Sequence, residues 1–544
     1  MHTMKTSLII GIGLLLISEL PIAVFSQDII ANPTVLPAPQ VLTIDVIRQQ
    51  LLPQLDAADS TTRANAARTL GEYRVLEAVD ALTKHLGDVA PNVRAESAYA
   101  LGKIGDHRPV PSLIITLGDG DKVVRVRGAM ALGRLADSTA VKPLISSLGD
   151  AAEDVRWAAA CSLGQISDIT SVGPLSALVK SRDTPAVRSA AVASLANFIN
   201  QEGLDTVLMA CHDVAPDVRM FAVRGLGWSK DARAVNAVIQ ALGDQEDKVR
   251  LMAIESLGFQ RATAGVPSLT VLLGDQKAAI REASARSLGC IDTPQSRAAL
   301  LDNVKDANEK VRAAVVQSLG MLKNTAAVPA VIDGLSDQSV LVRRAAATAL
   351  FFLQDARALS PLIDASQNDA DLRVRCNSLL ALGAFPGDKT MTILLGAMND
   401  GDEKVRSTAA HVLGHSGDVR AIPVLTHGLT DQSMLVRATC AHSLGEQKNA
   451  ASVPVLLAIL QQETDNALRA YSAMALGNIG DKQAVPQLIK MLTDPHPGVR
   501  QAAATALGLL KDPTAKDALT TLLQDPYAFV QQAATKAIAQ LAAP

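Results

Sequence analysis

The sequence predicts an all-α fold, a right-handed superhelical solenoid of about 16 helix-turn-helix repeats. Three observations predict it. The pair Val-Arg, or a close variant of it, recurs every 31 or 32 residues. Each recurrence stands within the same pattern of small and apolar residues, and no alternating polar and apolar run predicts a strand. A fixed period of this length is typical of repeat proteins rather than of separate globular domains.

The repeated arginine serves as position zero of each unit. It is Arg63, Arg94, Arg125, Arg156, Arg188, Arg219, Arg250, Arg281, Arg312, Arg343, Arg375, Arg406, Arg437, Arg469 and Arg500, with Gln531 in the sixteenth place.

Residues 1–26 have the pattern of a secretory signal peptide. Lys5 precedes the apolar run SLIIGIGLLLIS, which is too short to span a membrane. Val24 and Ser26 are small, so cleavage is predicted after Ser26. The alternative is a segment that stays attached as an N-terminal anchor. The pattern predicts an exported protein and leaves open whether it is periplasmic or extracellular.

The two ends of the repeat array are predicted next. Residues 27–40 are polar and rich in proline, which predicts a flexible leader, and residues 41–57 predict one capping helix. The array itself is expected over residues 50–541, with a period of 31. Gln531 and Gln532 replace the usual start of the motif, as expected of a terminal repeat whose outer face meets water.

The first helix of each unit is predicted from short apolar patterns such as AVPQLIKMLTD. A proline near its start fits the first helical turn, where the missing N–H is not needed. Such prolines are Pro111, Pro267, Pro329, Pro423 and Pro486.

The second helix of each unit follows the Val-Arg pair. That valine and positions three, four, seven and ten after the arginine fall on one helical face. Position seven is Leu in fifteen of the sixteen units, and positions three, four and six are mostly Ala, Ser or Val. Successive second helices are therefore expected to approach closely. Position eight is Gly in thirteen units and is expected to mark the end of the helix.

An aspartate stands six residues before the arginine in thirteen units. We expect it to accept backbone N–H groups at the turn that enters the second helix. The arginine is expected to bridge neighbouring units through charge-assisted hydrogen bonds. The alternative, acid and base pairs in a catalytic groove, would require fifteen equivalent active sites. The predicted structural ladder comprises Arg94, Arg125, Arg156, Arg219, Arg250, Arg312, Asp88, Asp119, Asp150, Asp244 and Asp306.

Segments such as VRRAAATAL and VRQAAATALG resemble the HEAT-repeat superfamily, and specifically the short HEAT-like repeat of the phycobilin (PBS) lyases. The resemblance covers roughly residues 50–541. It implies an α-α superhelix of the armadillo-like type. It implies little about function, because such arrays serve many roles.

Composition excludes several classes of function. The 51 Lys and Arg residues are balanced by 54 Asp and Glu residues, and aromatic residues make up 3% of the chain, so no nucleic-acid partner is expected. The five cysteines are odd in number and form no CxxC motif, which predicts buried thiols rather than disulfides or a zinc site. No transmembrane segment is predicted in the mature chain, and no cofactor is expected.

Enzymes of the HEAT-like class provide the alternative function. Resemblance to deoxyhypusine hydroxylase would imply His-Glu metal ligands, and the chain contains no His-Glu dipeptide. Phycobilin lyases act on cytosolic proteins, which a secretory signal does not fit. HEAT-like DNA glycosylases need a basic cleft, which the charge balance opposes. A lyase-like or hydroxylase-like (oxidoreductase) activity is therefore the disfavoured alternative.

Apolar side chains concentrate at positions one and nine of the second helices in the middle of the array. The candidate partner-binding residues are Trp157, Met220, Trp228, Leu251, Phe259, Met321 and Phe352. Cys290 continues the series at position nine between Phe259 and Met321. An exposed apolar ridge of this kind is a candidate binding surface. The alternative is local core, because the polar Ser229 and Gln260 occupy position ten, where an apolar residue is usual.

Two further sets of titratable residues on the second helices are interpreted as surface features rather than as functional sites. Arg224, Glu255 and Arg286 alternate in sign at position five of adjacent units, which predicts a weak surface ladder. His411 and His415 are four residues apart, and His442 lies one unit along. Such a pair can bind a metal, but no carboxylate accompanies it in the manner of HExxH, so a surface cluster is predicted.

The sequence thus predicts an exported, non-catalytic scaffold or adaptor that binds protein partners along the concave face of the solenoid. A purely structural spacer is a third alternative. The sequence does not define the partner, the curvature or the oligomeric state.

Overall fold

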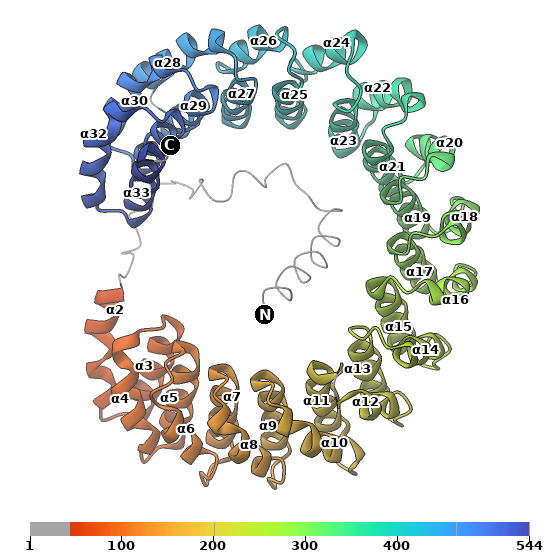
Figure 1. Cartoon of the computed structure of the whole chain (residues 1–544), viewed down its shortest axis with the longest axis vertical. Coiled ribbons are helices and arrows are strands. Elements are labelled where there is room, and N and C mark those ends of the chain that lie inside the picture. Colours follow the sequence, from red (N-terminus) through yellow and green to blue (C-terminus); the bar gives the residue numbers. More distant parts are fainter. Residues whose placement is uncertain (1–43, 201, 464, 543–544) are drawn as a thin grey trace. The chain divides into compact units, whose positions relative to one another are not determined.

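The computed structural model describes residues 44–200, 202–463 and 465–542. The predicted signal peptide, the leader and residues 41–43 lie outside the described residues. All regular structure in the described ranges is helical, without a strand (Figure 1). In the same ranges, no helix combines the length and the apolar character needed to cross a bilayer.

The described chain forms two compact units, residues 44–296 and 297–542, and the boundary lies within α18. The helices of the first unit are α2 (Ile44–Leu51), α3 (Ser60–Glu72), α4 (Val79–Lys84), α5 (Pro91–Ile104), α6 (Val110–Thr116), α7 (Lys122–Leu135), α8 (Val141–Ser147), α9 (Glu153–Ile166), α10 (Val172–Lys180), α11 (Pro185–Leu195), α12 (Leu204–Ala210), α13 (Pro216–Leu226), α14 (Ala232–Ala241), α15 (Asp247–Gln260), α16 (Val266–Leu272) and α17 (Ala278–Cys290).

The second unit continues the same alternation of shorter and longer helices. Its helices, after α18 (Pro294–Asp302), are α19 (Glu309–Met321), α20 (Val328–Asp333), α21 (Val340–Leu353), α22 (Leu359–Asn368), α23 (Leu372–Leu382), α24 (Asp388–Ala397), α25 (Glu403–His415), α26 (Ala421–Gly428), α27 (Met434–Glu446), α28 (Val453–Gln462), α29 (Asn466–Ile479), α30 (Val485–Met491), α31 (Pro497–Leu510), α32 (Lys516–Thr521) and α33 (Ala528–Ala542).

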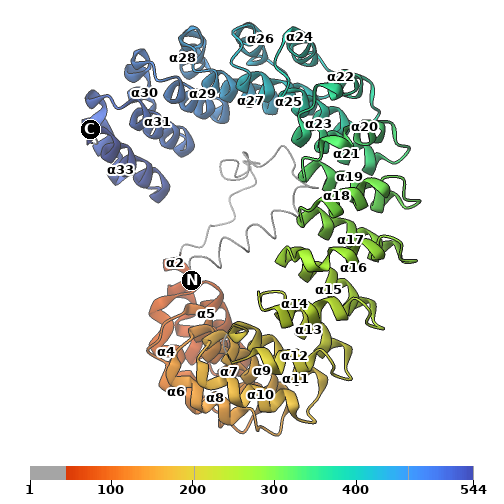
Figure 2. The ribbon, with the colours of Figure 1, turned by 45° about the vertical axis from the view of Figure 1, so that its right-hand side comes forward.

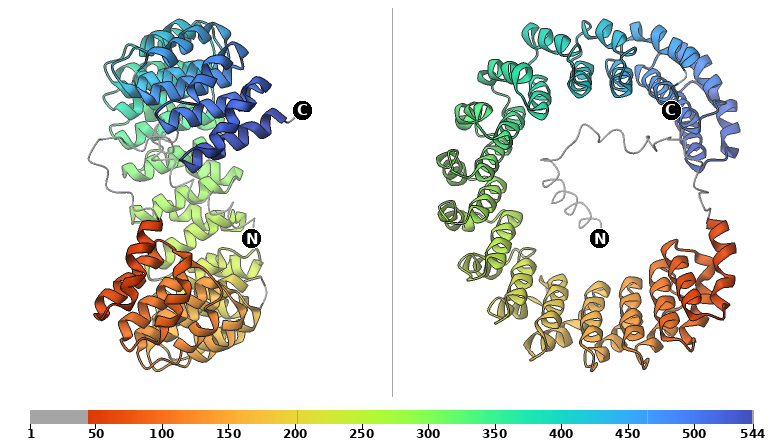
Figure 3. Two further views of the ribbon diagram at one scale, coloured as in Figure 1. Left: turned by 90° about the vertical axis from the view of Figure 1, so that its left-hand side faces the viewer. Right: turned by 180° about the vertical axis from the view of Figure 1, so that it is seen from behind.

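Each unit has two layers of helices. The odd-numbered helices, which are the second helices of the repeats, pack one against the next to form an inner row. The even-numbered first helices pack on the outer side of that row, as Figures 1 and 2 show for both units and the right-hand view of Figure 3 shows from behind. Side chains on the free side of the inner row therefore belong to the second helices alone. The chain is thus an α-solenoid.

The core lies between the two layers. Leucines at position seven of the second helices, such as Leu101, Leu132 and Leu163, are fully buried. First helices contribute Val and Leu side chains, and four of the five predicted prolines fall in the first two positions of their helices, as Pro111 does in α6. Pro423 is the third residue of α26.

The prediction that the glycine at position eight ends the second helix holds for α13 and α23, where Gly227 and Gly383 directly follow the last helical residue, and is wrong for most other repeats. Gly102 lies inside α5, and a Cβ atom there would stand 2.7 Å from the Cα atom of Ala131 in α7. The glycine is needed for close helix approach. The helix ends later, where Gly105 (φ 89°), Ala136 (φ 53°) and Ser167 (φ 58°) adopt the left-handed conformation.

The capping segment predicted over residues 41–57 is not one continuous helix in its described part. Its described part contains α2 and then a separate 3-10 turn, Pro53–Asp56. Leu52 still has helical dihedral angles, but Pro53 lacks the N–H that would continue the α-helical hydrogen bonds, so α2 ends before it.

Candidate functional site

The repeated arginine and aspartate join adjacent repeats. In α5, Nε and Nη2 of Arg94 donate to the two carboxylate oxygens of Asp119 at 2.7 and 2.8 Å. Nη1 of Arg94 donates to the carbonyl oxygen of Asp88 at 2.8 Å. The Asp119 carboxylate also accepts the backbone N–H of Asp121 at 2.8 Å. One arginine thus ties the turn of its own repeat to the turn of the next.

The other predicted ladder residues lie in equivalent places, with local variations. The same pairing joins Arg125 to Asp150, Arg219 to Asp244 and Arg312 to Asp337. Arg156 pairs with Asp183, because Arg182 stands where the fifth unit would have its aspartate. The guanidinium group of Arg250 forms two ion pairs, one with Asp247 at 2.7 Å and one with Asp275 at 3.1 Å. Asp306 accepts the backbone N–H of Asn308.

The electrostatics of this ladder favour the charged form of each partner. Hydrogen bonds from Arg63 lower the pKa of Asp88 to about 2. Hydrogen bonds from Arg94 and Arg125 likewise lower the pKa values of Asp119 and Asp150. These polar atoms are engaged by one another and by the backbone, so the ladder supports the scaffold and the candidate site must be sought elsewhere on the second helices.

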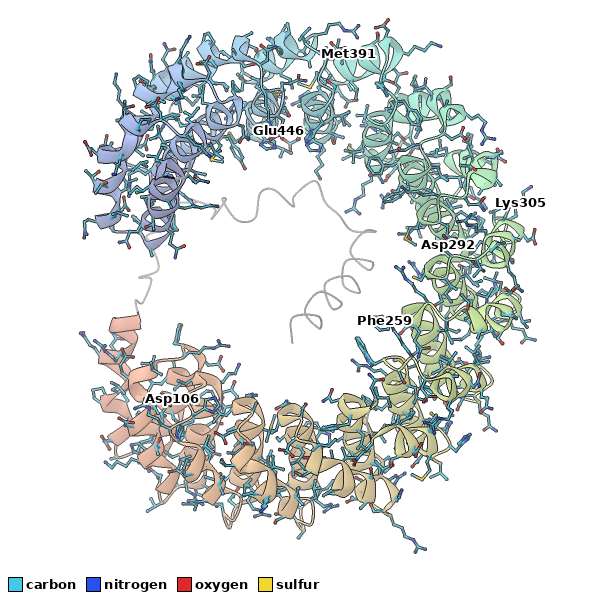
Figure 4. All side chains as sticks on the ribbon, viewed as in Figure 1. Asp106, Phe259, Asp292, Lys305, Met391 and Glu446 are labelled. Carbon is cyan, nitrogen blue, oxygen red and sulfur yellow. The ribbon has the colours of Figure 1, made fainter. Side chains whose placement is uncertain are left out.

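Two aromatic residues meet on the inner row of the first unit. Trp228 follows α13 and Phe259 lies in the last turn of α15. Their ring centroids are 4.5 Å apart with an edge-to-face angle of 64°. Trp228 is 48% exposed and Phe259 is 47% exposed. Figure 4 shows Phe259 on the inner side of the second helices.

These rings are not the local core of their repeats. Ser229 is only 1% exposed, and Gln260 reaches back to the preceding repeat. Nε2 of Gln260 donates to the carbonyl oxygens of Leu226 and Ser229 at 2.8 and 2.9 Å. Position ten is therefore filled by polar groups that close the end of α13, which leaves the aromatic pair in contact with solvent.

The remaining candidates are more scattered than one ridge. Trp157 is exposed on α9, two repeats before Trp228, and no ring contact joins the two in the described chain. Met220 on α13 and Leu251 on α15 are half-buried. Met321 and Phe352 are half-buried and belong to the second compact unit. Among the predicted binding residues, a contact between aromatic rings in the described chain joins only Trp228 and Phe259.

Sequence reasoning missed Phe351, which is exposed and contacts Phe352 edge to face at 5.4 Å between ring centroids. The signal was present, because Phe351 stands at position eight, where thirteen other units have glycine. A large side chain cannot enter the narrow space between two second helices and must point out of it.

Sequence reasoning also missed a cluster of cations around Tyr99 on α5. Arg127 and Arg134 of α7 and Lys103 of α5 lie over its ring. These residues come from positions two, five and nine of two adjacent repeats. Comparing neighbouring units at all three positions, instead of one position at a time, could have revealed the cluster.

The predicted alternating ladder at position five is wrong. Arg286 donates to Glu282 on its own helix at 2.9 Å. In the described chain, Glu255 forms no ion pair with Arg224 or Arg286. Residues at position five of adjacent repeats are separated by the full distance between helices, whereas Glu282 lies one helical turn away.

The histidines form a surface cluster on α25 and α27. The rings of His411 and His415 are 4.6 Å apart, and Nδ1 of His415 lies 3.0 Å from the carbonyl oxygen of His411. Burial lowers the pKa values of His411 and His442, which favours their neutral forms. Among the described residues, no three His, Cys, Asp or Glu side chains are placed to bind a metal.

The cysteines are free thiols in the described chain, and none is fully exposed. Burial raises the pKa of Cys161 to about 11 and those of Cys211 and Cys440 to about 12. These thiols are therefore protonated, and weakly nucleophilic, near neutral pH.

Solved structures with a similar fold include yeast importin-β (Kap95p) and Kap121p. The chain is 15% identical to yeast importin-β (Kap95p), with a TM-score of 0.64 over 91% of this chain and 82% of that chain. It is 14% identical to Kap95p in a complex with Nup1, with a TM-score of 0.66 over 92% of this chain and 82% of Kap95p. For Kap121p the identity is 14% and the TM-score 0.53, over 92% and 71%. At these identities the likeness concerns the fold alone.

No curated protein matches the chain in sequence. The family model of HEAT repeats matches residues 48–115, 110–196, 172–248, 235–308, 297–383, 360–445, 391–470 and 453–539. The phycobilin-lyase subtype stays a prediction. The family matches extend over nearly all of the described residues, and the chain belongs to the HEAT-repeat family.

Proposed function

We propose that this chain is a non-catalytic scaffold that binds a protein partner along its inner row of second helices, with Trp228 and Phe259 as the apolar anchor. The observation that carries the proposal is the exposure of this aromatic pair beside polar residues that already close the local core. Keeping two large apolar rings in water is unfavourable unless they serve a contact.

Several further features support a binding role. Trp is among the residues that most often dominate binding energy at protein interfaces. Both tryptophans of the chain are exposed and lie in the repeats of the first unit. Yeast importin-β, which has a similar fold, has been solved in complexes with RanGDP and with Nup1. The signal-peptide pattern of residues 1–26 supports the further proposal that the chain acts outside the cytoplasm.

The test is capture of partners from the cells that make the protein, with a variant carrying Trp228→Ala and Phe259→Ala. Together the two truncations are expected to cost at least about 2 kcal/mol of binding free energy, so partner affinity should fall by about 30-fold or more. The rings are half exposed, so circular dichroism should show unchanged helicity.

The matched control is Ile115→Ala with Val271→Ala. These apolar residues lie on the outer helices α6 and α16 of the same unit and are 77% and 76% exposed. The control should retain the partner. Equal capture by the wild-type chain and the Trp228→Ala/Phe259→Ala variant would refute the anchor. Equal loss of partner capture in the Trp228→Ala/Phe259→Ala variant and in the control variant would show that the effect is not specific to the inner row.

A further inference from the structure

The strongest unexplained feature of the first unit is the cation cluster around Tyr99, defined by Arg68, Lys103, Arg127 and Arg134. The guanidinium carbon of Arg127 lies 4.9 Å from the Tyr99 ring centroid, and that of Arg134 lies 5.2 Å away. The ammonium nitrogen of Lys103 lies 5.7 Å from the same centroid. Three cations thus share one aromatic ring on the inner row.

Two carboxylates belong to this cluster, and both are already engaged. Glu72 accepts the hydroxyl group of Tyr99 at 2.8 Å. Glu96 accepts two hydrogen bonds from Arg68 at 2.7 and 3.0 Å, and it lies 3.9 Å from Arg127. Four cations therefore face two carboxylates, which leaves an excess of two positive charges.

This excess is local and contrasts with the rest of the chain. The whole chain has a formal net charge of −3. Most ladder arginines of the described chain form an ion pair with an aspartate of a neighbouring repeat, as Arg94 does with Asp119. By contrast, no carboxylate of the described chain lies within 4.0 Å of Lys103 or Arg134.

The Tyr99 ring orients these cations for binding. A guanidinium group stacked on an aromatic face keeps its N–H groups directed outward in the plane of the group. Those N–H groups match the two oxygens of a carboxylate. Arg134 is exposed, and Lys103 and Arg127 are half-buried, so the donors are accessible from the free side of the inner row.

We propose that the Tyr99 cluster binds a carboxylate-rich segment of a protein partner. The proposal rests on the proposed scaffold function and adds the chemistry of a second contact point in the same unit. Glu72 and Glu96 are built into the surface and would repel closely spaced phosphates. Side-chain carboxylates spaced along a peptide can reach Arg134 and Lys103 while avoiding these two residues.

The test uses the full-length chain and a fluorescent peptide of alternating glutamate and serine, with a glutamine-serine peptide as the neutral comparison. We expect saturable binding of the acidic peptide that weakens with added salt. Arg127→Gln with Arg134→Gln should weaken it by about tenfold or more.

The matched control is Arg108→Gln with Arg233→Gln, which removes two exposed arginines that pair with carboxylates outside the cluster. Binding by this control should stay within about twofold of wild type. Equal weakening in both variants, or none in the Arg127→Gln/Arg134→Gln variant, overturns the proposal.

Two further measurements decide the class of ligand. A single-stranded oligonucleotide or vesicles of anionic lipid that bind more tightly than the acidic peptide would overturn the assignment to a protein segment. Absence of saturable peptide binding at millimolar concentration would overturn it as well. Failure of the Trp228 and Phe259 anchor would be seen in partner capture and not in this peptide titration, so the two results can be told apart.

Discussion

Replacing Gly71 with valine is expected to separate α3 from α5 and to destabilise the first repeats by about 3 kcal/mol, the upper end of the usual cost of overpacking. A Cβ atom at Gly71 would lie 2.5 Å from the Cα atom and 2.7 Å from the Cβ atom of Ala100. Those atoms belong to the helix itself and cannot rotate away. The whole of α5 would have to move.

Urea unfolding followed by circular dichroism, together with hydrogen exchange of α3 and α5, measures this effect. Gly173→Ala in α10 is the control, because a Cβ atom there has no neighbour within 4 Å. Helix propensity predicts that Gly173→Ala is neutral or stabilising by up to about 1 kcal/mol. Similar stability of the Gly71→Val variant and wild type would show that helix contact does not require glycine.

The second large effect is expected from Asp119→Ala, which should destabilise the contact between α5 and α7 by about 3 kcal/mol. It removes both hydrogen bonds from Arg94 and the acceptor for the Asp121 N–H. The guanidinium group of Arg94, which is mostly buried, would lose its counterion. An unpaired charge of this kind costs more than the pair itself contributes.

Asp119→Asn separates the two roles of this side chain, because an amide oxygen can still accept the Asp121 N–H. The Asp119→Asn variant should therefore lose less stability than the Asp119→Ala variant. Hydrogen exchange of the α5 and α7 amides measures the difference, since repeats couple mainly to their neighbours. Equal protection of these amides against hydrogen exchange in the wild-type chain and in the Asp119→Ala variant would contradict the ladder's role in stability.

The same ladder predicts how stability depends on pH. The pKa of Asp88 is lowered to about 2 by hydrogen bonds from Arg63, below its unfolded value of about 3.9. A group whose pKa is lowered on folding stabilises the native state fully above the unfolded pKa. This contribution should therefore be present above about pH 4 and be lost as the pH falls towards about 2.

The repeat made much of the fold predictable. In a solenoid each unit contacts only its neighbours, so one pattern repeated at a fixed spacing determines the same contacts many times. The leucine at position seven and the arginine at position zero occupy equivalent environments in most units, as Leu101 and Arg94 illustrate. Local periodicity was therefore sufficient to identify the helices, the core and the residues of the ladder.

Features that depend on distances between repeats were not predictable in this way. Gly102 could end a helix or permit close contact, and only the position of Ala131 decides between them. The Trp228 and Phe259 pair and the Tyr99 cluster arise from side chains on different helices. Their side-chain directions depend on packing across repeats, which spacing along one chain does not define.

The central claim is that the inner row of second helices, and not the outer row, contacts the partner. Site-specific photo-crosslinking tests it most directly, with p-benzoylphenylalanine at Glu255 on α15 or at Val271 on α16. Both positions are exposed and lie in adjacent helices of the same unit. We predict that the partner is crosslinked from position 255 and not from position 271. Crosslinking from position 271 alone, or equally from both, would contradict the account.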